Sequence, residues 1–387
     1  MNETPTPAEG RIISLDIIRG IALFGILLAN MASFKSPVFQ EGAMQARTIL
    51  SDSALNIFAV ISVDGLVTGK FYPMFSLLFG LGFYLFYQRL QNQTKRRYYR
   101  RMSFLLVLGL VHLVFIWSGD ILFTYAVGGF FLLLFVKKSA GSLVKWGIGL
   151  VTFSAVLMTL LLLLGNAASM MKGGMMTGAS RAMDIMPSGN YAEILGFRLS
   201  SEVFLILFNT PFAVINVFGI FLIGIALGKA GWFHDPKTYE KQWKTLRLHA
   251  GWSGILGAVL VVMLKLDQLP VPYWAADALG QGLNILAGPL LMLFYVSVLV
   301  LLVSGGAPLA WLAPVGRMAL TNYLLQSVIG VLLFHGYGFG LYGSVGAFTG
   351  MLIALGVFAA QVVLSQLWLK RFRQGPMEAL WRKWTYA

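Results

Sequence analysis

The feature that most constrains this chain is a series of apolar stretches, each about 20 residues long, which recur from one end of the sequence to the other. A helix of that length crosses the hydrocarbon core of a bilayer. Mean hydropathy is +0.76, and only 11% of the residues are charged. The sequence therefore predicts an all-α, polytopic membrane protein, with residues 1–387 forming a single transmembrane domain rather than two or three soluble ones.

Hydropathy predicts ten transmembrane helices, a bundle that loops back and forth across the membrane. The predicted spans lie near residues 12–33, 69–90, 102–118, 120–137, 144–166, 203–229, 247–266, 277–304, 317–336 and 345–371. Residues 54–70 are moderately apolar but contain Asp64 and Lys70. That segment is either an interfacial helix or a broken, partly re-entrant piece, so the number of crossings is ten or eleven.

The distribution of basic residues predicts the orientation. Placing the N-terminus inside puts 21 of the 29 Lys and Arg in cytoplasmic segments and only five outside. Cytoplasmic segments of membrane proteins carry an excess of Lys and Arg, so both termini are expected in the cytoplasm. The expected location is the inner, or plasma, membrane of the cell. The same clustering at the ends of apolar segments argues against a nucleic-acid partner and favours membrane lipids.

Two of the predicted loops are long. Residues 166–202 form an external loop rich in Met and Gly, and loops of that length are usually either functional or disordered. Residues 229–248 form a cytoplasmic loop with amphipathic character, suited to the anionic leaflet.

The chain has no Cys, which excludes disulfides and thiolate chemistry, and its four His show no metal-ligand spacing, so no metal site is predicted.

Ionisable groups within the spans are costly in lipid, and each is therefore a candidate functional residue. Asp16 and Arg19 stand three residues apart and can pair on one helix face, either as a structural ion pair or as part of a site. Lys70 either reaches the external surface or lines a polar cavity that takes an anionic substrate. His112 lies well inside a span, where it is either a hydrogen-bonded core residue or a general base. Asp120 either caps the next helix or faces an external substrate.

Two further segments are candidates for binding a substrate. In GRMALTNYLLQS, polar residues surround the helix, so this half of the span cannot face lipid; they include Arg317, Thr321, Tyr323 and Gln326. The run KRRYYRR at 95–101, with Arg100 and Arg101, either sets topology and binds anionic lipid or forms a cytoplasmic entrance for a phosphorylated donor. Gly224 and Gly228 are expected to serve helix packing.

Several motifs together resemble a known family. LDIIRGIALFGILLANM, GKFYPMFSLLFG, GLVHLVFIWSGDILFTYAVGG, GRMALTNYLLQSVI and KRFRQGPMEALWRKW are similar to the YeiB-like bacterial membrane family, a domain of unknown function. That family looks like a branch of the transmembrane acyltransferase superfamily, which shares the LD-x-x-RG pattern of Asp16, Arg19 and Gly20. Relatives in the superfamily place a catalytic His after the first helix, where this chain has SFKSPVF, so His112 is a substitute proposed for it.

The resemblance implies an acyl-coenzyme A donor that binds at the cytoplasmic side and an acceptor at or beyond the membrane. On this interpretation His112, Asp120 and Asp16 are catalytic. The donor would be bound by Arg19, Lys70, Arg100, Arg101 and Arg317, with Thr321, Tyr323 and Gln326 orienting the substrate or stabilising the oxyanion. A transporter of small molecules or lipids using the same cavity, and a non-catalytic membrane sensor, are the alternatives. The sequence leaves open whether the chain forms a homo-oligomer with further copies of itself.

Overall fold

The computed structural model describes residues 12–37, 52–89, 94–171 and 177–386, which form helices and, within these ranges, no strand. The predicted all-α fold is confirmed. The helical elements in chain order are α1 (Ile13–Lys35), α3 (Ala54–Leu66), α4 (Phe71–Arg89), α5 (Thr94–Val111), η3 (His112–Ile116), α6 (Leu122–Phe130), η4 (Leu132–Leu134), α7 (Ala140–Met171), α8 (Thr177–Ile185), α9 (Tyr191–Arg198), η5 (Leu199–Val203), α10 (Phe204–Ala230), α11 (Glu240–Lys265), α12 (Tyr273–Ser304), η6 (Ala310–Leu312), α13 (Ala313–Arg317), α14 (Ala319–Phe334), α15 (Ala347–Arg371) and α16 (Pro376–Tyr386).

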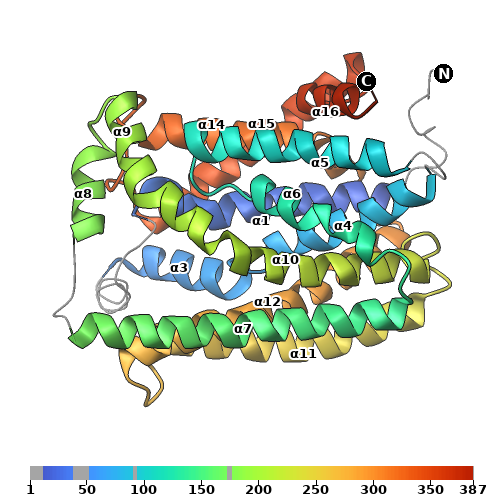
Figure 1. Ribbon diagram of the computed structural model, residues 1–387, viewed down its shortest axis with the longest axis horizontal. Helices are drawn as coiled ribbons and strands as arrows, with labels where there is room; N and C mark the ends of the chain where they lie inside the picture. The colour runs from blue at the N-terminus through green and yellow to red at the C-terminus, as the bar shows by residue number, and fades with distance from the viewer. Residues whose placement is uncertain (1–11, 38–51, 90–93, 172–176, 387) are drawn as a thin grey trace.

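The long helices run roughly parallel to one another, as Figure 1 shows. The helices α7, α11 and α12 form one side of the bundle, and α1, α5, α14 and α15 lie toward the other, with α4 and α10 between them. Buried apolar side chains of α1, α6, α10 and α14 form the main core. This arrangement is that of a multi-pass membrane bundle.

The surface of the bundle is apolar where the long helices face outward. Large exposed side chains there include Phe153, Leu160 and Leu164 of α7, Phe204 and Phe208 of α10, Trp252 and Leu256 of α11, and Leu355 and Leu364 of α15. A soluble protein rarely exposes so much contiguous apolar surface, whereas lipid tails accept it without cost. The structure therefore fits a membrane protein whose interior holds the polar groups.

The number of spans differs from the sequence prediction. In the described part of the chain, eight helices are long and apolar enough to cross a membrane. The number rises to nine if residues 310–317 (η6 and α13) and α14, bent by 77° relative to each other, count as one span. In place of the predicted span 120–137, the structure has the short helices α6 and η4. The prediction was wrong because hydropathy reports the composition of a stretch and does not report where a helix breaks. Residues 54–89 form one apolar stretch, in which α3 and α4 are separated by a turn, so residues 54–70 lead into the second span.

The two ends of the bundle differ. At one end, the helices α8 and α9, the π-helical turn η5 and the loop after α14 form a cap, defined here as residues 177–203 and 335–346 (Figure 1). The predicted loop 166–202 is therefore mostly helical in its described residues. Two bonds tie the cap to the end of α1: Lys35 Nζ donates to the carbonyl of Val345 at 3.0 Å, and the amide of Gly343 donates to the carbonyl of Lys35 at 2.8 Å.

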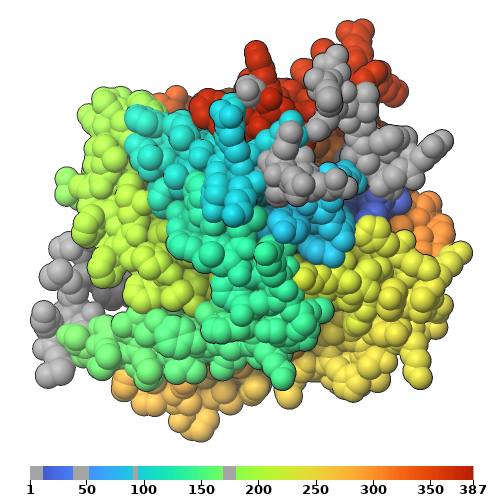
Figure 2. All heavy atoms as spheres, turned by 45° about the vertical axis from the view of Figure 1, so that its right-hand side comes forward, coloured from blue at the N-terminus to red at the C-terminus, as the bar shows by residue number. Residues whose placement is uncertain are grey.

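The opposite end, called the basic end, comprises residues 94–101, 229–247 and 370–386. It carries most of the clustered Lys and Arg that the sequence analysis singled out. The C-terminal helix α16 lies across it, against α5 and α14 (Figure 1). Figure 2, with this side turned forward, shows the C-terminal residues in red on the surface of the molecule.

Close helix contacts explain the predicted packing role of two glycines. A Cβ added to Gly224 on α10 would lie 2.1 Å from the carbonyl oxygen of Leu77 on α4. One added to Gly228 would lie 2.7 Å from the ring of Tyr84. Because the nearest atom at Gly224 is backbone and cannot move aside, only glycine permits this approach of α10 to α4.

Replacement of Gly224 tests this contact. We expect Gly224→Ala to lower the free energy of unfolding by roughly 1 to 3 kcal/mol, because the methyl group overpacks the interface. Gly149→Ala on α7 is the matched control, since a Cβ there meets nothing within 4 Å. It should leave stability unchanged or raise it by up to about 1 kcal/mol. Thermal unfolding in detergent measures both, and equal melting temperatures for the two variants would contradict the packing role.

Candidate functional site

His112 and Asp120 form a fully buried pair. His112 Nδ1 lies 2.8 Å from Asp120 Oδ1, and both side chains are 0% exposed. The other carboxylate oxygen of Asp120 accepts the amide hydrogen of Phe123 at 2.6 Å, in the first turn of α6. Asp120 therefore performs the capping role considered in the sequence analysis and also holds the imidazole. The contact with His112 adds to the two roles, capping and facing an external substrate, that the sequence left open.

The second ring nitrogen of His112 has a different environment. Among the residues described, Nε2 is buried and has no hydrogen-bond partner. Buried polar atoms are nearly always paired, so an unpaired one calls for a functional explanation. If Nδ1 carries the proton and donates it to Asp120, Nε2 presents a lone pair that is free to accept a proton. This arrangement suits a general base.

His112 stands at the point where α5 widens into the π-helical turn η3. Such turns occur frequently at functional sites. The guanidinium of Arg198, at the end of α9, donates to the carbonyl of Leu113 at 2.8 Å and to that of Ile116 at 2.9 Å. These bonds satisfy carbonyls that the irregular turn leaves without regular α-helical partners. A second π-helical turn, η5, follows Arg198 directly and contacts η3.

Tyr323 of α14 completes the surroundings of the pair. Its hydroxyl accepts the amide hydrogen of Ile121 at 3.2 Å and donates to the carbonyl of Gly119 at 3.4 Å. Its ring centroid lies 5.4 Å from that of His112. Tyr323 thus fixes the turn that carries Asp120, and the structure brings together three of the residues predicted from sequence.

The other two candidates on α14 lie elsewhere. The hydroxyl of Thr321 donates to Glu378 Oε2 of α16 at 2.6 Å, and Glu378 Oε1 accepts the amides of Leu320 and Thr321. Gln326 Nε2 donates to Gln361 Oε1 on α15 at 2.9 Å. Their contacts join helices, and neither belongs to the group around His112.

Arg100 and Arg101 lie at the basic end, and Arg317 contacts it. Arg101 stacks on the ring of Trp381 at 3.6 Å, and Arg100 Nε donates to the carbonyl of Trp384 at 3.1 Å. Arg317 donates to the carbonyl of Arg373 at 3.2 Å. The C-terminal residues, including α16, therefore cover the segment that the sequence analysis assigned to a phosphorylated donor.

Asp16 and Arg19 lie near the start of α1. They form the predicted ion pair at 3.0 Å. The backbone of α13 crosses α1 here so closely that a Cβ on Gly316 would lie 1.9 Å from the carbonyl oxygen of Asp16. Gly20 makes a similar approach to the carbonyl of Leu312, which gives the glycine of the LD-x-x-RG pattern a packing role.

Lys70 occupies a third place, in the turn between α3 and α4. Its ammonium is fully buried and donates to the carbonyls of Asp64 at 3.0 Å and Thr68 at 2.7 Å, and to Asn284 Oδ1 of α12 at 2.8 Å. These three acceptors match its three hydrogens. Lys70 neither reaches the surface nor meets the arginines at the basic end.

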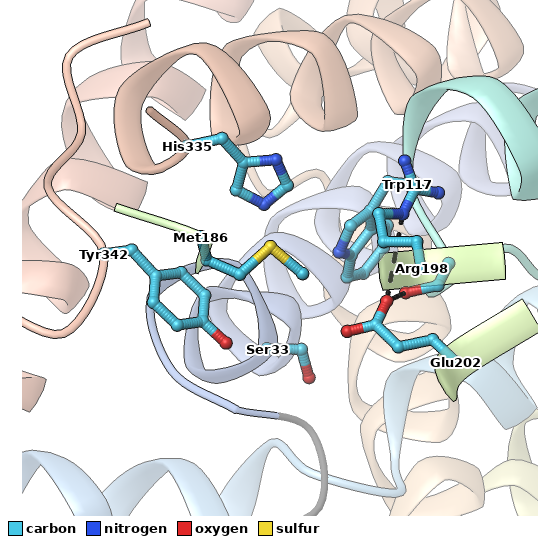
Figure 3. A pocket seen from close by; sticks show the side chains of 8 residues that line it. Ser33, Trp117, Met186, Arg198, Glu202, His335 and Tyr342 are labelled. Carbon is cyan, nitrogen blue, oxygen red and sulfur yellow. Dashed lines mark hydrogen bonds and ion pairs between the residues drawn. The ribbon is translucent and has the colours of Figure 1, made fainter. Parts of the chain in front are cut away.

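Sequence reasoning missed a small pocket in the cap. It is lined by Ser33, Trp117, Ser118, Met186, Arg198, Glu202, His335 and Tyr342, from five separate parts of the chain (Figure 3). Glu202 Oε2 accepts the hydroxyl hydrogen of Ser118 at 2.5 Å and lies 3.8 Å from Arg198 Nε. The spacing of Arg198 and Glu202, four residues apart, was the available signal, but both fell in or beside a segment assigned to an external loop.

His335 follows the last residue of α14 and lies in the cap, outside the spans. Its Nδ1 is 3.1 Å from the hydroxyl of Tyr337. Burial, and then the positive charge of Arg198, lower the pKa of His335 to about 4. The imidazole is therefore neutral in the folded protein at neutral pH.

This shift predicts a pH-dependent stability. Below the ordinary pKa of 6.5, His335 of the unfolded chain is protonated whereas His335 of the folded chain stays neutral. The free energy of unfolding therefore falls as the pH drops from about 6.5 to 4. The loss is at most about 3 kcal/mol. His335→Gln should flatten this part of the profile, whereas His234→Gln, in an exposed loop, should not. Melting temperatures between pH 4.5 and 8 measure the slope, and an unchanged slope in His335→Gln would refute the assignment.

Comparison with known proteins gives relatives along the whole chain. The family described as "Protein of unknown function (DUF418)" matches residues 227–387. The chain is 34% identical over 400 residues to "Uncharacterized protein YxaH" of Bacillus subtilis (strain 168), covering 99% of this chain and 96% of that protein. It is 28% identical to "Uncharacterized protein YeiB" of Escherichia coli (strain K12), covering 97% and 96%. A 39.9 kDa protein of Bacillus acidopullulyticus is 26% identical over 99% of this chain.

Proposed function

Because the chain belongs to one family with YxaH, and its residues 227–387 match a family described as of unknown function, we propose a function from its own residues. We propose that it is a membrane acyltransferase that moves an acyl group from acyl-coenzyme A to a hydroxyl or amine acceptor. The observation that carries the proposal is the buried His112–Asp120 pair, whose His112 Nε2 has no partner within the described ranges of the chain. The resemblance of the sequence motifs to the transmembrane acyltransferase superfamily supports the same reaction.

The reaction follows from the geometry of the pair. Asp120 holds Nδ1–H, which leaves Nε2 to accept the proton of the acceptor group as that group attacks the thioester carbonyl. The new bond joins the acceptor oxygen or nitrogen to the acyl carbon, and the carbon–sulfur bond of the thioester breaks. The proton passes from Nε2 to the departing coenzyme A thiolate. Asp120 stabilises the imidazolium between these steps, and Tyr323 acts as a positioning residue for the turn that bears Asp120.

The donor is proposed to enter at the basic end. Arg100 and Arg101 lie there, Arg317 contacts it, and the phosphates of coenzyme A pair well with guanidinium groups. His112 follows Arg101 by 11 residues, a rise of about 16 Å along the helix, so the extended pantetheine arm would have to bridge this distance. The excess of Lys and Arg supports a cytoplasmic basic end in an inner membrane.

Single-cysteine labelling tests the orientation, and the absence of native Cys makes the signal clean. Ser180→Cys in the cap should react with a membrane-impermeant maleimide on intact cells, because the exposed residue faces outward. Gln242→Cys at the basic end, also exposed, should react only after permeabilisation. The opposite pattern would place the basic end outside and remove the proposed route for the donor.

Replacement of His112 tests the chemistry. His112→Gln should lower acyl transfer about 10² to 10⁴-fold while keeping the folded yield, because glutamine retains a hydrogen-bonding group but cannot act as the base. Membranes supplied with radiolabelled acetyl- and longer acyl-coenzyme A report transfer, and size-exclusion chromatography reports folding. His249→Gln, an exposed histidine on α11, is the matched control and should behave as wild type. Undiminished transfer by His112→Gln would exclude the general base.

A further inference from the structure

The C-terminal helix α16 has apolar side chains on two faces. On the inner face, Met377 and Trp381 pack against the core, and the indole of Trp381 donates to the carbonyl of Arg101 at 2.9 Å. On the outer face, Leu380 is 52% exposed and Trp384 is 49% exposed. Residues four apart are neighbours on a helix surface, so these two side chains form one exposed stripe. A helix that faces water usually carries polar residues there, so the stripe indicates an apolar neighbour.

The position of α16 along α5 indicates what this neighbour is. Arg100 Nε donates to the carbonyl of Trp384 at 3.1 Å, and the ring of Trp384 lies 6.0 Å from that of Phe104. Residues 95–101 of α5 include five Lys and Arg, whereas residues 102–111 include no charged residue. In a transmembrane helix such a change marks the boundary between lipid headgroups and acyl chains. The helix α16 therefore lies beside α5 at the level of that boundary.

The exposed stripe of α16 continues the lipid-facing surface of α5. Beyond Phe104, α5 exposes Val107 and Val111, which follow it on the same face of the helix. Trp384 adjoins this face through its contact with Phe104. Trp and Tyr are enriched at the level of the headgroups, and Trp384 and Tyr386 are both exposed at this level.

The charge around α16 is strongly positive. Residues 94–101 and 370–386 contain ten Lys and Arg and a single acidic residue, Glu378. The carboxylate of Glu378 already accepts three hydrogen bonds from Leu320 and Thr321. The exposed cations of these segments are Lys95, Arg96, Lys370, Arg371, Arg373 and Lys383. Basic side chains at the edge of a bilayer attract anionic headgroups, and Lys383 lies in sequence directly before Trp384 of the exposed stripe.

We infer that α16 is an interfacial helix that binds the anionic phospholipids of the leaflet at the basic end. Leu380 and Trp384 enter the boundary between headgroups and acyl chains, and Lys383 pairs with headgroup phosphates. The contacts of α16 with Arg100 and Arg101 hold its outer face in this position. This interaction does not depend on the proposed acyl transfer.

Fluorescence quenching on the full chain tests the depth of the helix, and the absence of native Cys permits a single label. Leu380→Cys carrying an NBD fluorophore is placed in nanodiscs of phosphatidylglycerol and phosphatidylcholine. A nitroxide near the headgroup end of the lipid acyl chain should quench this label by about half or more, because an interfacial helix buries its apolar face near that depth. Aqueous iodide should quench it weakly. Gln242→Cys, exposed at the same end on α11, is the control and should show the opposite pattern.

A second measurement tests the preference for anionic lipid. At equal mole fractions, nitroxide-labelled phosphatidylglycerol should quench the residue 380 label more strongly than nitroxide-labelled phosphatidylcholine. Lys383→Gln should lower this preference about 2- to 5-fold, because one cation near the headgroups is lost. Lys241→Gln, which removes an exposed lysine of α11 on the other side of the bundle, is the matched control and should leave the preference unchanged (Figure 1).

Three results would overturn the inference. Strong quenching of the residue 380 label by iodide would place the outer face of α16 in water. Protection from both iodide and lipid nitroxide would mean that protein, such as a second copy of the chain, covers this face. Equal quenching by the two labelled lipids would remove the preference for anionic headgroups.

Discussion

A polar group inside a membrane protein must find its partner within the protein, because the surrounding lipid offers none. This constraint explains how the chain tolerates its broken helices. Arg198 binds the carbonyls of the π-helical turn η3, and Lys70 binds those of the turn between α3 and α4. Glu378 binds the amides at the start of α14. In each case a charged side chain satisfies the backbone at a break, and Arg198 and Glu378 come from distant parts of the sequence.

These three breaks have different consequences. At two of the breaks, Lys70 and Glu378 bind backbone groups of the protein, and we interpret both side chains as structural supports. At η3, Arg198 binds two backbone carbonyls in the same way, yet the side chain that begins the turn, His112, keeps one nitrogen without a partner among the described residues. Leaving a buried polar atom unpaired costs about 1 to 3 kcal/mol. The protein bears that cost at a nitrogen whose ring is held in place by Asp120, which is the pattern expected of a prepared reactive atom.

The sequence predicted the parts of the fold that depend on composition. Apolar stretches located most of the long helices, and the polar candidates His112, Asp120 and Tyr323 were found because ionisable and hydrogen-bonding groups are conspicuous inside apolar spans. It could not predict that α6 is short, because hydropathy does not report where an apolar helix ends. It also could not pair Glu378 with Thr321, or Lys70 with Asn284, because those contacts join residues 57 and 214 positions apart.

The cap pocket shows the limit of reasoning from hydropathy most clearly. Arg198 and Glu202 fall in a stretch whose composition predicts a long external loop, and Ser33 near the end of α1 lies far in sequence from Tyr342 in the loop after α14. Only the folded cap brings them over the turn from Trp117 to Asp120. Arg198, which binds the carbonyl of Ile116, fixes that turn on one side, and Tyr323, which binds the amide of Ile121, fixes it on the other, so one rigid backbone segment holds both His112 and Asp120.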